Sequence, residues 1–258
     1  MITGATKANQ SSEKLLAVLE LLATQGSMRL KDIASELKIP PSTTLRFINS
    51  LVKLGYAQQD QYNLRYELTY KLISLSNMFV SNHSFHQSAH ASLVRLSQIC
   101  KESCSLGIED QSQIVYIDVI NTSEGILNTT QRIGKIAPLY CTGIGKILLQ
   151  QYTPEDLDRY INKNGMPSLT VHTLTKKQQL LDELKEAADT GFAYDRGECE
   201  IGVHCIATGI CDYAGKYIAG ISVSLPVARM TDEHIRLIKQ ELRTTAKEIS
   251  SLYGYLGP

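Results

Sequence analysis

The feature that most constrains the fold of this chain is the order of five short patterned segments near its N-terminus. The first three place apolar residues three and four positions apart, as amphipathic helices do, and the last two alternate apolar with polar residues, as a β-hairpin does. Pro41 suits the first turn of the third helix, and Gly55 ends it. The segments are residues 11–23, 30–37, 42–54, 56–59 and 64–68. This order predicts a winged helix-turn-helix, whose third helix enters the major groove of DNA.

The third predicted helix carries residue types that contact DNA. Three hydroxyl side chains lie in its first turn, where the helix dipole favours phosphate, and an arginine that suits a phosphate or a base edge follows them. A lysine ends the helix, and an arginine beside the hairpin tip either touches phosphate or the minor groove or stays a solvated charge. The alternative is a capping Ser/Thr cluster on an ordinary helix. The predicted DNA contacts are Ser42, Thr43, Thr44, Arg46, Lys53 and Arg65.

The distribution of charge is compatible with this prediction. The formal net charge is zero, which by itself argues against a nucleic-acid partner. However, residues 1–72 hold nine basic and six acidic side chains, and residues 37–59 hold three basic side chains and no carboxylate. A surface that approaches phosphates has this pattern, and so does a neutral helical domain with a chance gap in its acids.

The rest of the chain predicts two linker helices, over residues 70–79 and 85–100, followed by an α+β domain. We expect domain boundaries at 1–68, 69–100 and 101–258, with the linker available for a dimer contact. Strand patterns and helix patterns are mixed in the last part, which favours a mostly antiparallel sheet with packed helices. The expected strands cover 104–108, 114–120, 126–131, 192–196, 204–211 and 217–225, and the expected helices 143–150, 154–162, 176–190 and 232–253.

Several segments in the same order resemble one known family. Leu30–Ala34, Ile39–Arg46 and Leu51–Tyr56 resemble the helix-turn-helix of the IclR-type transcriptional regulators. In the second domain, three further segments resemble family signatures: Pro138–Lys146, Asp195–Ala207 and Ala219–Leu225. The resemblance covers about residues 12–254. It implies a DNA-binding transcription regulator, with repression as the expected sign, and a GAF-like α+β effector domain. Residues 114–117 and 133–135 are most similar to regulators of sugar-acid catabolism, such as the 2-keto-3-deoxygluconate repressor type.

The resemblance also implies an effector pocket for a small carboxylate, such as a 2-oxo acid or a sugar acid. The free N–H groups that open the helix at Gly143 suit an anion, and Ser222 and Ser224 alternate on a strand, so that their hydroxyls share one face. The alternative is a polar seam satisfied by backbone or water. The pocket residues that the resemblance implies are Gly143, Ile144, Asp195, Cys205, Ser222 and Ser224.

Other chemistries find less support. Zinc at Cys199, His204, Cys205 and Cys211 is disfavoured, because the spacing is wrong and neighbours on a strand face opposite ways. Glu198 and Glu200 form an acid pair without a nucleophile, and Cys100 with Cys104 is either a redox pair or two core thiols. We therefore expect that the protein binds no metal and no cofactor and that it is not an enzyme.

The sequence also bears on where the protein is located and on what it binds. No apolar run reaches about 20 residues, and the polar start lacks a signal-peptide pattern, so we expect a cytoplasmic protein that does not enter a membrane. We expect a homodimer or homotetramer on a pseudo-palindromic operator in double-stranded DNA. The alternatives are a small-molecule sensor that works without DNA, for which Arg46→Ala changes nothing, and an enzyme on a GAF-like scaffold, whose turnover Asp195→Asn abolishes.

Overall fold

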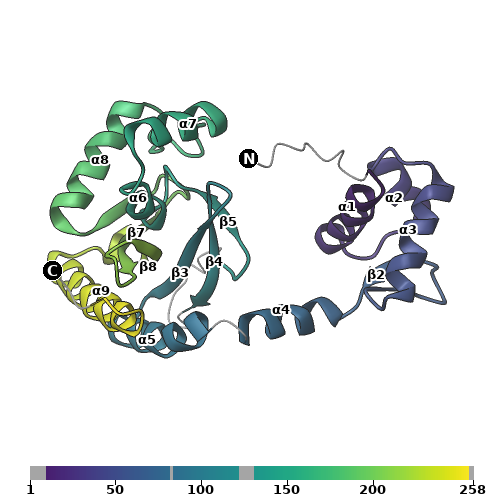
Figure 1. The fold of residues 1–258 in the computed structure, drawn as a ribbon, viewed down its shortest axis with the longest axis horizontal. Coiled ribbons are helices and arrows are strands. Elements are labelled where there is room, and N and C mark those ends of the chain that lie inside the picture. The colour runs from purple at the N-terminus through teal and green to yellow at the C-terminus, as the bar shows by residue number, and fades with distance from the viewer. Residues whose placement is uncertain (1–9, 82–83, 122–130, 256–258) are drawn as a thin grey trace. The chain divides into compact units, whose positions relative to one another are not determined.

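The computed structural model describes residues 10–81, 84–121 and 131–255 of the 258-residue chain. The chain divides into two compact units, residues 1–82 and residues 83–258 (Figure 1). Helices dominate the first unit, and a six-stranded sheet forms the centre of the second. The two predicted linker helices are formed, the first of them in the first unit and the second in the second unit.

The first unit has the predicted order of three helices, a hairpin and a further helix. Its core is formed by apolar faces of the first three helices together with Ala57 and Tyr66 of the hairpin. Pro40 precedes the third helix and Pro41 is its first residue, so no amide donor is lost from the helical ladder. The elements are α1 (Gln10–Gln25), α2 (Leu30–Glu36), α3 (Pro41–Lys53), β1 (Ala57–Gln59), β2 (Tyr66–Leu68) and α4 (Lys71–Ser81).

The hairpin is shorter than its apolar pattern predicts. Leu64, which the alternation assigned to a strand, lies in the tip with a positive φ of 56° and is exposed. The Asp60 side chain organises this tip, because its Oδ1 accepts the N–H groups of Tyr62 at 2.8 Å and Asn63 at 3.1 Å. Such local side-chain to backbone bonds compete with the hydrogen bonds of a strand ladder. The second strand of the hairpin therefore begins only at Tyr66.

The second unit is an α+β domain, as predicted. Its sheet is antiparallel throughout, with the strand order β5-β4-β3-β8-β7-β6. The elements are α5 (Ser84–Cys100), β3 (Ser103–Asp110), β4 (Gln113–Ile120), β5 (Ile136–Pro138), α6 (Gly143–Leu149), α7 (Pro154–Asn164), α8 (Lys177–Thr190), β6 (Ala193–Arg196), β7 (Val203–Cys211), β8 (Tyr217–Pro226), the short 3₁₀ helix Val227–Arg229 and α9 (Asp232–Leu252).

The two faces of this sheet carry different helices. Helices α5 and α9 pack together against one face, where Ile221, Val223 and Leu225 of β8 enter an apolar core (Figure 1). Helix α6 packs on the other face against β7 and β8, with α8 next to it. Because side chains alternate along a strand, Ser222 and Ser224, which lie between these three residues in β8, face α6. The α6 face is therefore where polar groups of the central strands are collected.

Two sequence expectations differ from the structure in this unit. The short strand β5 pairs with β4 from Ile136 to Pro138, where no strand was predicted, since three residues are too few to show an alternating pattern. The strand expected over residues 126–131 lies outside the described residues, apart from Gln131, which is not in a strand.

Candidate functional site

The exposed face of α3 forms a polar stripe. Ser42, Arg46, Asn49 and Lys53 follow one another at spacings of four, three and four residues, all are exposed, and together they line one shallow groove. The opposite side of the helix is buried in the core. Arg46 lies against the ring of Phe47, with its guanidinium carbon 5.4 Å from the ring centre. This stripe has the spacing and the donors of a helix that reads a DNA groove.

The structure places the other predicted DNA contacts differently. Thr44 is fully buried, and its hydroxyl donates to the carbonyl of Pro40 at 3.2 Å, so the predicted contact from Thr44 is corrected to a packing role. Thr43 is half-buried. The guanidinium of Arg65 donates to the carbonyl of Ser27 at 2.7 Å and 3.2 Å, and so ties the hairpin to the turn after α1. Asn49 was missed, although its position one turn after Arg46 signals it.

Strand register brings most of the predicted effector residues together on the α6 face. Cys205 pairs with Asp195 on one side and with Ser224 on the other, and the Cys205 Sγ lies 3.1 Å from the Ser224 Oγ. Ser222 is one pair further along β8 on the same face, opposite Ala207. All four residues are buried. The sheet thus supplies a thiol, two hydroxyls and a carboxyl group from three adjacent strands.

A narrow cavity of about 20 Å³ lies beside these residues. Its polar wall includes residues that the sequence did not reveal, among them Tyr116 of β4 and Gln131. The Gln131 side-chain oxygen accepts hydrogen bonds from the hydroxyls of Ser105 and Ser224. The lining residues are Tyr116, Gln131, Lys135, Ala137, Asp195, Cys199, Glu200, Val203 and Cys205. Lys135 is the only cation among them, and its Nζ lies 4.0 Å from a carboxylate oxygen of Glu200.

Asp195 has an unusual protonation equilibrium. Its Oδ1 accepts the backbone N–H groups of Glu198 at 2.7 Å and Cys199 at 3.3 Å. Burial nevertheless raises the pKa of Asp195 to about 7, because desolvation outweighs these bonds and the nearby Glu198 carboxylate adds to it. At neutral pH the side chain therefore exists in both forms. The protonated form donates a hydrogen bond to an acceptor, which an ionised aspartate does not.

Gly143 and Ile144 serve the packing of α6 on the sheet. A Cβ on Gly143 would lie 2.9 Å from the Cβ of Ala207, so glycine permits the close approach of the two elements. The Ile144 side chain fills the space above Gly220, where an added Cβ would meet it at 2.8 Å. Neither residue lines the cavity. Their assignment to effector binding remains a prediction, whereas the structure shows them in contact with β7 and β8.

Lys146, the last residue of the segment Pro138–Lys146 that resembles a family signature, is a buried structural cation. Its Nζ donates to Glu198 Oε1 at 2.6 Å, to the carbonyl of Tyr194 at 2.8 Å and to Glu183 Oε2 at 3.2 Å, and the side chain is fully buried. Arg196 joins Glu183 from the exposed side. This cluster fixes α6 and α8 to β6 and to the loop after β6, which carries Cys199 into the cavity wall.

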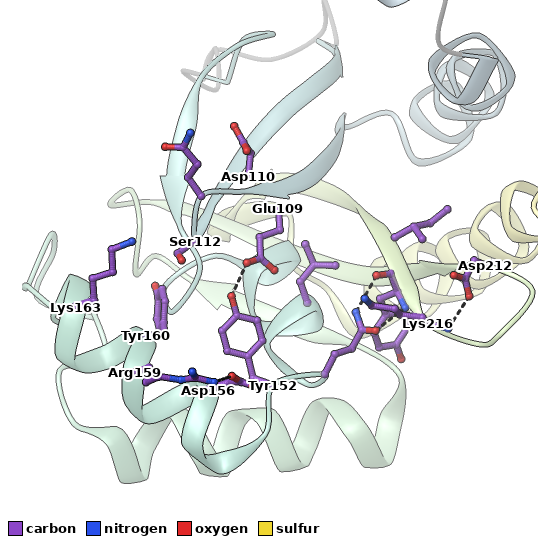
Figure 2. Close-up of a pocket in the computed structure, with 15 residues that line it drawn as sticks. Glu109, Asp110, Ser112, Tyr152, Asp156, Arg159, Tyr160, Lys163, Asp212 and Lys216 are labelled. Carbon is purple, nitrogen blue, oxygen red and sulfur yellow. Dashed lines mark hydrogen bonds and ion pairs between the residues drawn. The ribbon is translucent and has the colours of Figure 1, made fainter. Parts of the chain in front are cut away.

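A second, open groove of about 760 Å³ lies where the β3–β4 hairpin meets α7. Two pairs of its polar groups can be followed in Figure 2: the Tyr152 hydroxyl donates to Glu109, and Asp156 pairs with Arg159 on α7. None of the predicted effector residues lines it. The open groove is thus larger than the narrow cavity, and two of its ionisable pairs, Tyr152 with Glu109 and Asp156 with Arg159, are already engaged within the protein.

The two units define the class of protein: a winged helix-turn-helix with a basic, exposed third helix, carried with an α+β domain that encloses polar groups of three strands. Residues 77–251 match the family described as bacterial transcriptional regulator IclR C-terminal, and residues 11–61 match the IclR helix-turn-helix domain. The chain belongs to the IclR family of bacterial transcriptional regulators. It is a DNA-binding transcription regulator with an effector domain, and not an enzyme.

Individual proteins agree with this assignment. The HTH-type transcriptional regulator KdgR of Escherichia coli (strain K12) is 31% identical over 94% of this chain and 92% of its own length. The HTH-type transcriptional repressor AllR of Salmonella typhimurium is 29% identical over 98% of this chain and 93% of its own. The structure of an IclR homolog from Microbacterium hydrocarbonoxydans, complexed with 4-hydroxybenzoate, has a TM-score of 0.80, 20% identity, and coverage of 93% and 98%. Among the described residues, no helix is long and apolar enough to cross a membrane.

Proposed function

We propose that this protein is a repressor that binds a pseudo-palindromic operator as a homodimer or homotetramer in the cytoplasm, and that a small carboxylate in the narrow cavity changes this binding. The relative named as a repressor supports the sign of regulation. The homolog complexed with 4-hydroxybenzoate, itself a carboxylate, supports the effector class. The ligand must bind with different affinity to two arrangements of the paired helix-turn-helix units, one that fits the operator and one that does not. A ligand without such a difference shifts no equilibrium between them.

The stripe on α3 supports direct DNA contact. Arg46 and Asn49 carry side chains that bind guanine and adenine edges in the major groove, while Ser42 and Lys53 suit phosphates. Replacing Arg46 by alanine should weaken binding by about 1–3 kcal/mol if it reads a base. Lys163→Ala in the second unit is the matched control, because it also removes one exposed positive charge. Equal loss in the two variants would mean that only net charge matters.

The single observation that carries the effector proposal is the Gln131 side-chain oxygen, which accepts from Ser105 and Ser224 beside the protonatable Asp195. A ligand carboxylate offers the same kind of acceptor oxygen with a full charge, and charge-assisted hydrogen bonds are the stronger ones. Lys135 adds a cation to the same wall. Because 20 Å³ holds about one water molecule, the ligand has to displace the Gln131 side chain to enter.

The effector proposal is tested by calorimetric titration of the full-length protein with pyruvate, 2-keto-3-deoxygluconate and 4-hydroxybenzoate. We expect one acid to bind, Ser224→Ala to weaken it, and Gln131→Ala to bind at least as tightly as the native protein, because the competing side chain is removed. Tyr152→Phe, which alters only the open groove, serves as the control. Weaker binding in Tyr152→Phe with no change in Ser224→Ala would place the effector in the open groove instead.

The described part of α4 supports self-association. Ile73, Leu75 and Met78 are large apolar side chains with more than a third of their surface exposed. Apolar side chains gathered on one short helix are typical of an interface. Sedimentation analysis of the native protein and of an Ile73→Glu variant tests this: we expect a dimer or tetramer that the variant weakens. A native monomer at micromolar concentration would contradict the proposed assembly.

A further inference from the structure

Helix α9, the long yellow helix of Figure 1, carries a row of four positively charged side chains along one side. Their spacings of three, four and four residues place them on one face of the helix. Three of them are exposed, and Lys239 is half-buried. The row covers about 16 Å of helix, because each residue adds about 1.5 Å. The residues of this α9 row are Arg236, Lys239, Arg243 and Lys247.

The α9 row is not neutralised by the protein itself. Within residues 10–81, 84–121 and 131–255, none of its four side chains forms an ion pair with a carboxylate. By comparison, Arg95 of α5 and Arg229 each pair with a glutamate. Like charges three or four positions apart repel one another and destabilise a helix. An anion bound along the row would remove this repulsion.

The carboxylates of α9 do not interrupt the row. Glu248 pairs with Arg95 of α5, and Glu241 lies two turns earlier on the same side of the helix. Asp232 and Glu233 lie in the first turn, where a negative charge suits the helix dipole. Beyond this first turn, α9 therefore presents its acids toward α5 and its cations on a separate face.

Two aromatic rings hold the middle of the row in place. The Lys239 Nζ lies 5.5 Å from the ring centre of Phe192 and 5.3 Å from that of Tyr194, and the guanidinium carbon of Arg243 lies 5.1 Å from the ring centre of Phe192. Phe192 is itself buried. A cation is attracted to the face of a ring, but the ring has no net charge, so the positive charge is positioned without being neutralised. Side chains that are already positioned lose less conformational freedom when a partner binds.

The partner that fits this surface is a linear polyanion. Residues 83–258 hold 17 basic and 20 acidic side chains, so the row stands out in a unit that is acidic as a whole. Over about 16 Å of its axis, one strand of B-DNA carries about five phosphates, which is close to the number of cations in the row. Because the chain is a DNA-binding regulator, a duplex held by its first unit is also present at a raised effective concentration for its second unit.

We propose that the α9 row is a second DNA contact, which binds the phosphate backbone of the duplex beyond the base pairs that α3 reads. Contacts to phosphate carry no direct sequence information, so the row adds affinity and salt dependence rather than specificity. The inference rests on DNA binding by the first unit, and it does not depend on the proposed effector.

The test compares two duplexes that carry the same sequence, selected from a random library by the native full-length protein. One holds the selected sequence alone, and the other has about 20 further base pairs on each side. Fluorescence anisotropy over a salt series should show that the longer duplex binds about tenfold more tightly at low salt. The slope of log affinity against log salt should be steeper by about 3 to 4 per bound chain, because each phosphate contact contributes about 0.9.

Two matched variants, each with four cations replaced by glutamine, assign this difference to a surface. The variant of the α9 row should bind both duplexes like the short one and keep the native affinity for the short duplex. The control variant loses four exposed positive charges scattered over the same unit and should retain the preference for the longer duplex. The control substitutions are Lys163→Gln, Lys176→Gln, Lys185→Gln and Lys216→Gln.

A milder variant keeps the proposal testable if the replacement of all four cations impairs folding. Arg236→Gln with Lys247→Gln leaves the two cations above the aromatic rings in place and should lose about half of the additional salt slope. Equal affinity of the native protein for the two duplexes would overturn the proposal and leave sequence-specific binding by α3 intact. An equal loss in the control variant would also overturn it. If the row variant changed only the oligomeric state in sedimentation analysis, the row would be a contact between copies of the chain instead.

Discussion

Replacing Lys146 by methionine isolates the role of the buried cation. The Lys146 ammonium is surrounded by Glu198 Oε1 at 2.6 Å, the Tyr194 carbonyl at 2.8 Å and Glu183 Oε2 at 3.2 Å, and it has no exposed surface. Methionine is also unbranched and only one atom shorter, but it leaves the buried Glu198 without its countercharge. Removing one partner of a buried ion pair costs about 3–5 kcal/mol. For a unit of this size, that lowers the melting temperature by about 6–20 °C.

Urea unfolding and calorimetry measure this change. Burial already raises the pKa of Glu198, and Lys146 opposes that rise, so the pKa should climb further in Lys146→Met. A raised carboxyl pKa means that the folded state keeps its proton longer than the unfolded state, so stability falls as pH rises. The penalty should therefore be smaller at pH 5 than at pH 8. The double variant Lys146→Met with Glu198→Met removes both charges and should recover part of the loss. A single variant within 1 kcal/mol of the native protein at both pH values would refute a structural role for Lys146.

Three further predictions follow from the same geometry. Lys53→Ala should weaken binding to all DNA sequences about equally and reduce the salt slope of binding by about 1, measured by anisotropy at several salt concentrations. Because burial raises the pKa of Asp195 to about 7 and only its protonated form donates to a carboxylate, effector affinity should fall about tenfold between pH 6 and pH 8, and Asp195→Asn should remove this dependence in titration calorimetry. Gly145→Ala should destabilise the second unit strongly in thermal unfolding, since the added Cβ would lie 2.2 Å from the Leu139 carbonyl oxygen.

The DNA-binding unit was largely predictable from the sequence, because its signals are local. Helical spacing, Pro41 and Gly55 fix where α3 begins and ends, to within one or two residues of the structure. Arg46 and Lys53, both predicted as DNA contacts, lie on its exposed side. Thr44 was misassigned because residue type was weighed without the helix face: two positions after Ser42 the side chain points into the core. Arg65 found a long-range partner in Ser27, which no local pattern reveals.

The effector cavity was predictable only in part, because it depends on strand register. The alternation in β8 was enough to place Ser222 and Ser224 on one face. The order of the six strands decides which other residues join them, and this order brings Tyr116 near Asp195 from a position far earlier in the chain. Gln131 and Cys199 lie in loops, where no regular repeat in the sequence indicates which way a side chain points. The resemblance implied that Gly143 and Ile144 bind the effector. In this structure Gly143 packs closely on Ala207, and Ile144 packs closely on Gly220.

The central claim is that one chain couples DNA binding to a small acid. The direct test is selection of preferred duplexes from a random library, followed by fluorescence anisotropy of the selected duplex with and without the acid that binds the protein. We predict a pseudo-palindromic site whose dissociation constant changes at least tenfold with the acid, which corresponds to about 1.4 kcal/mol of coupling. A selected site whose affinity is the same at every acid concentration, or no preferred sequence at low salt, would contradict the account.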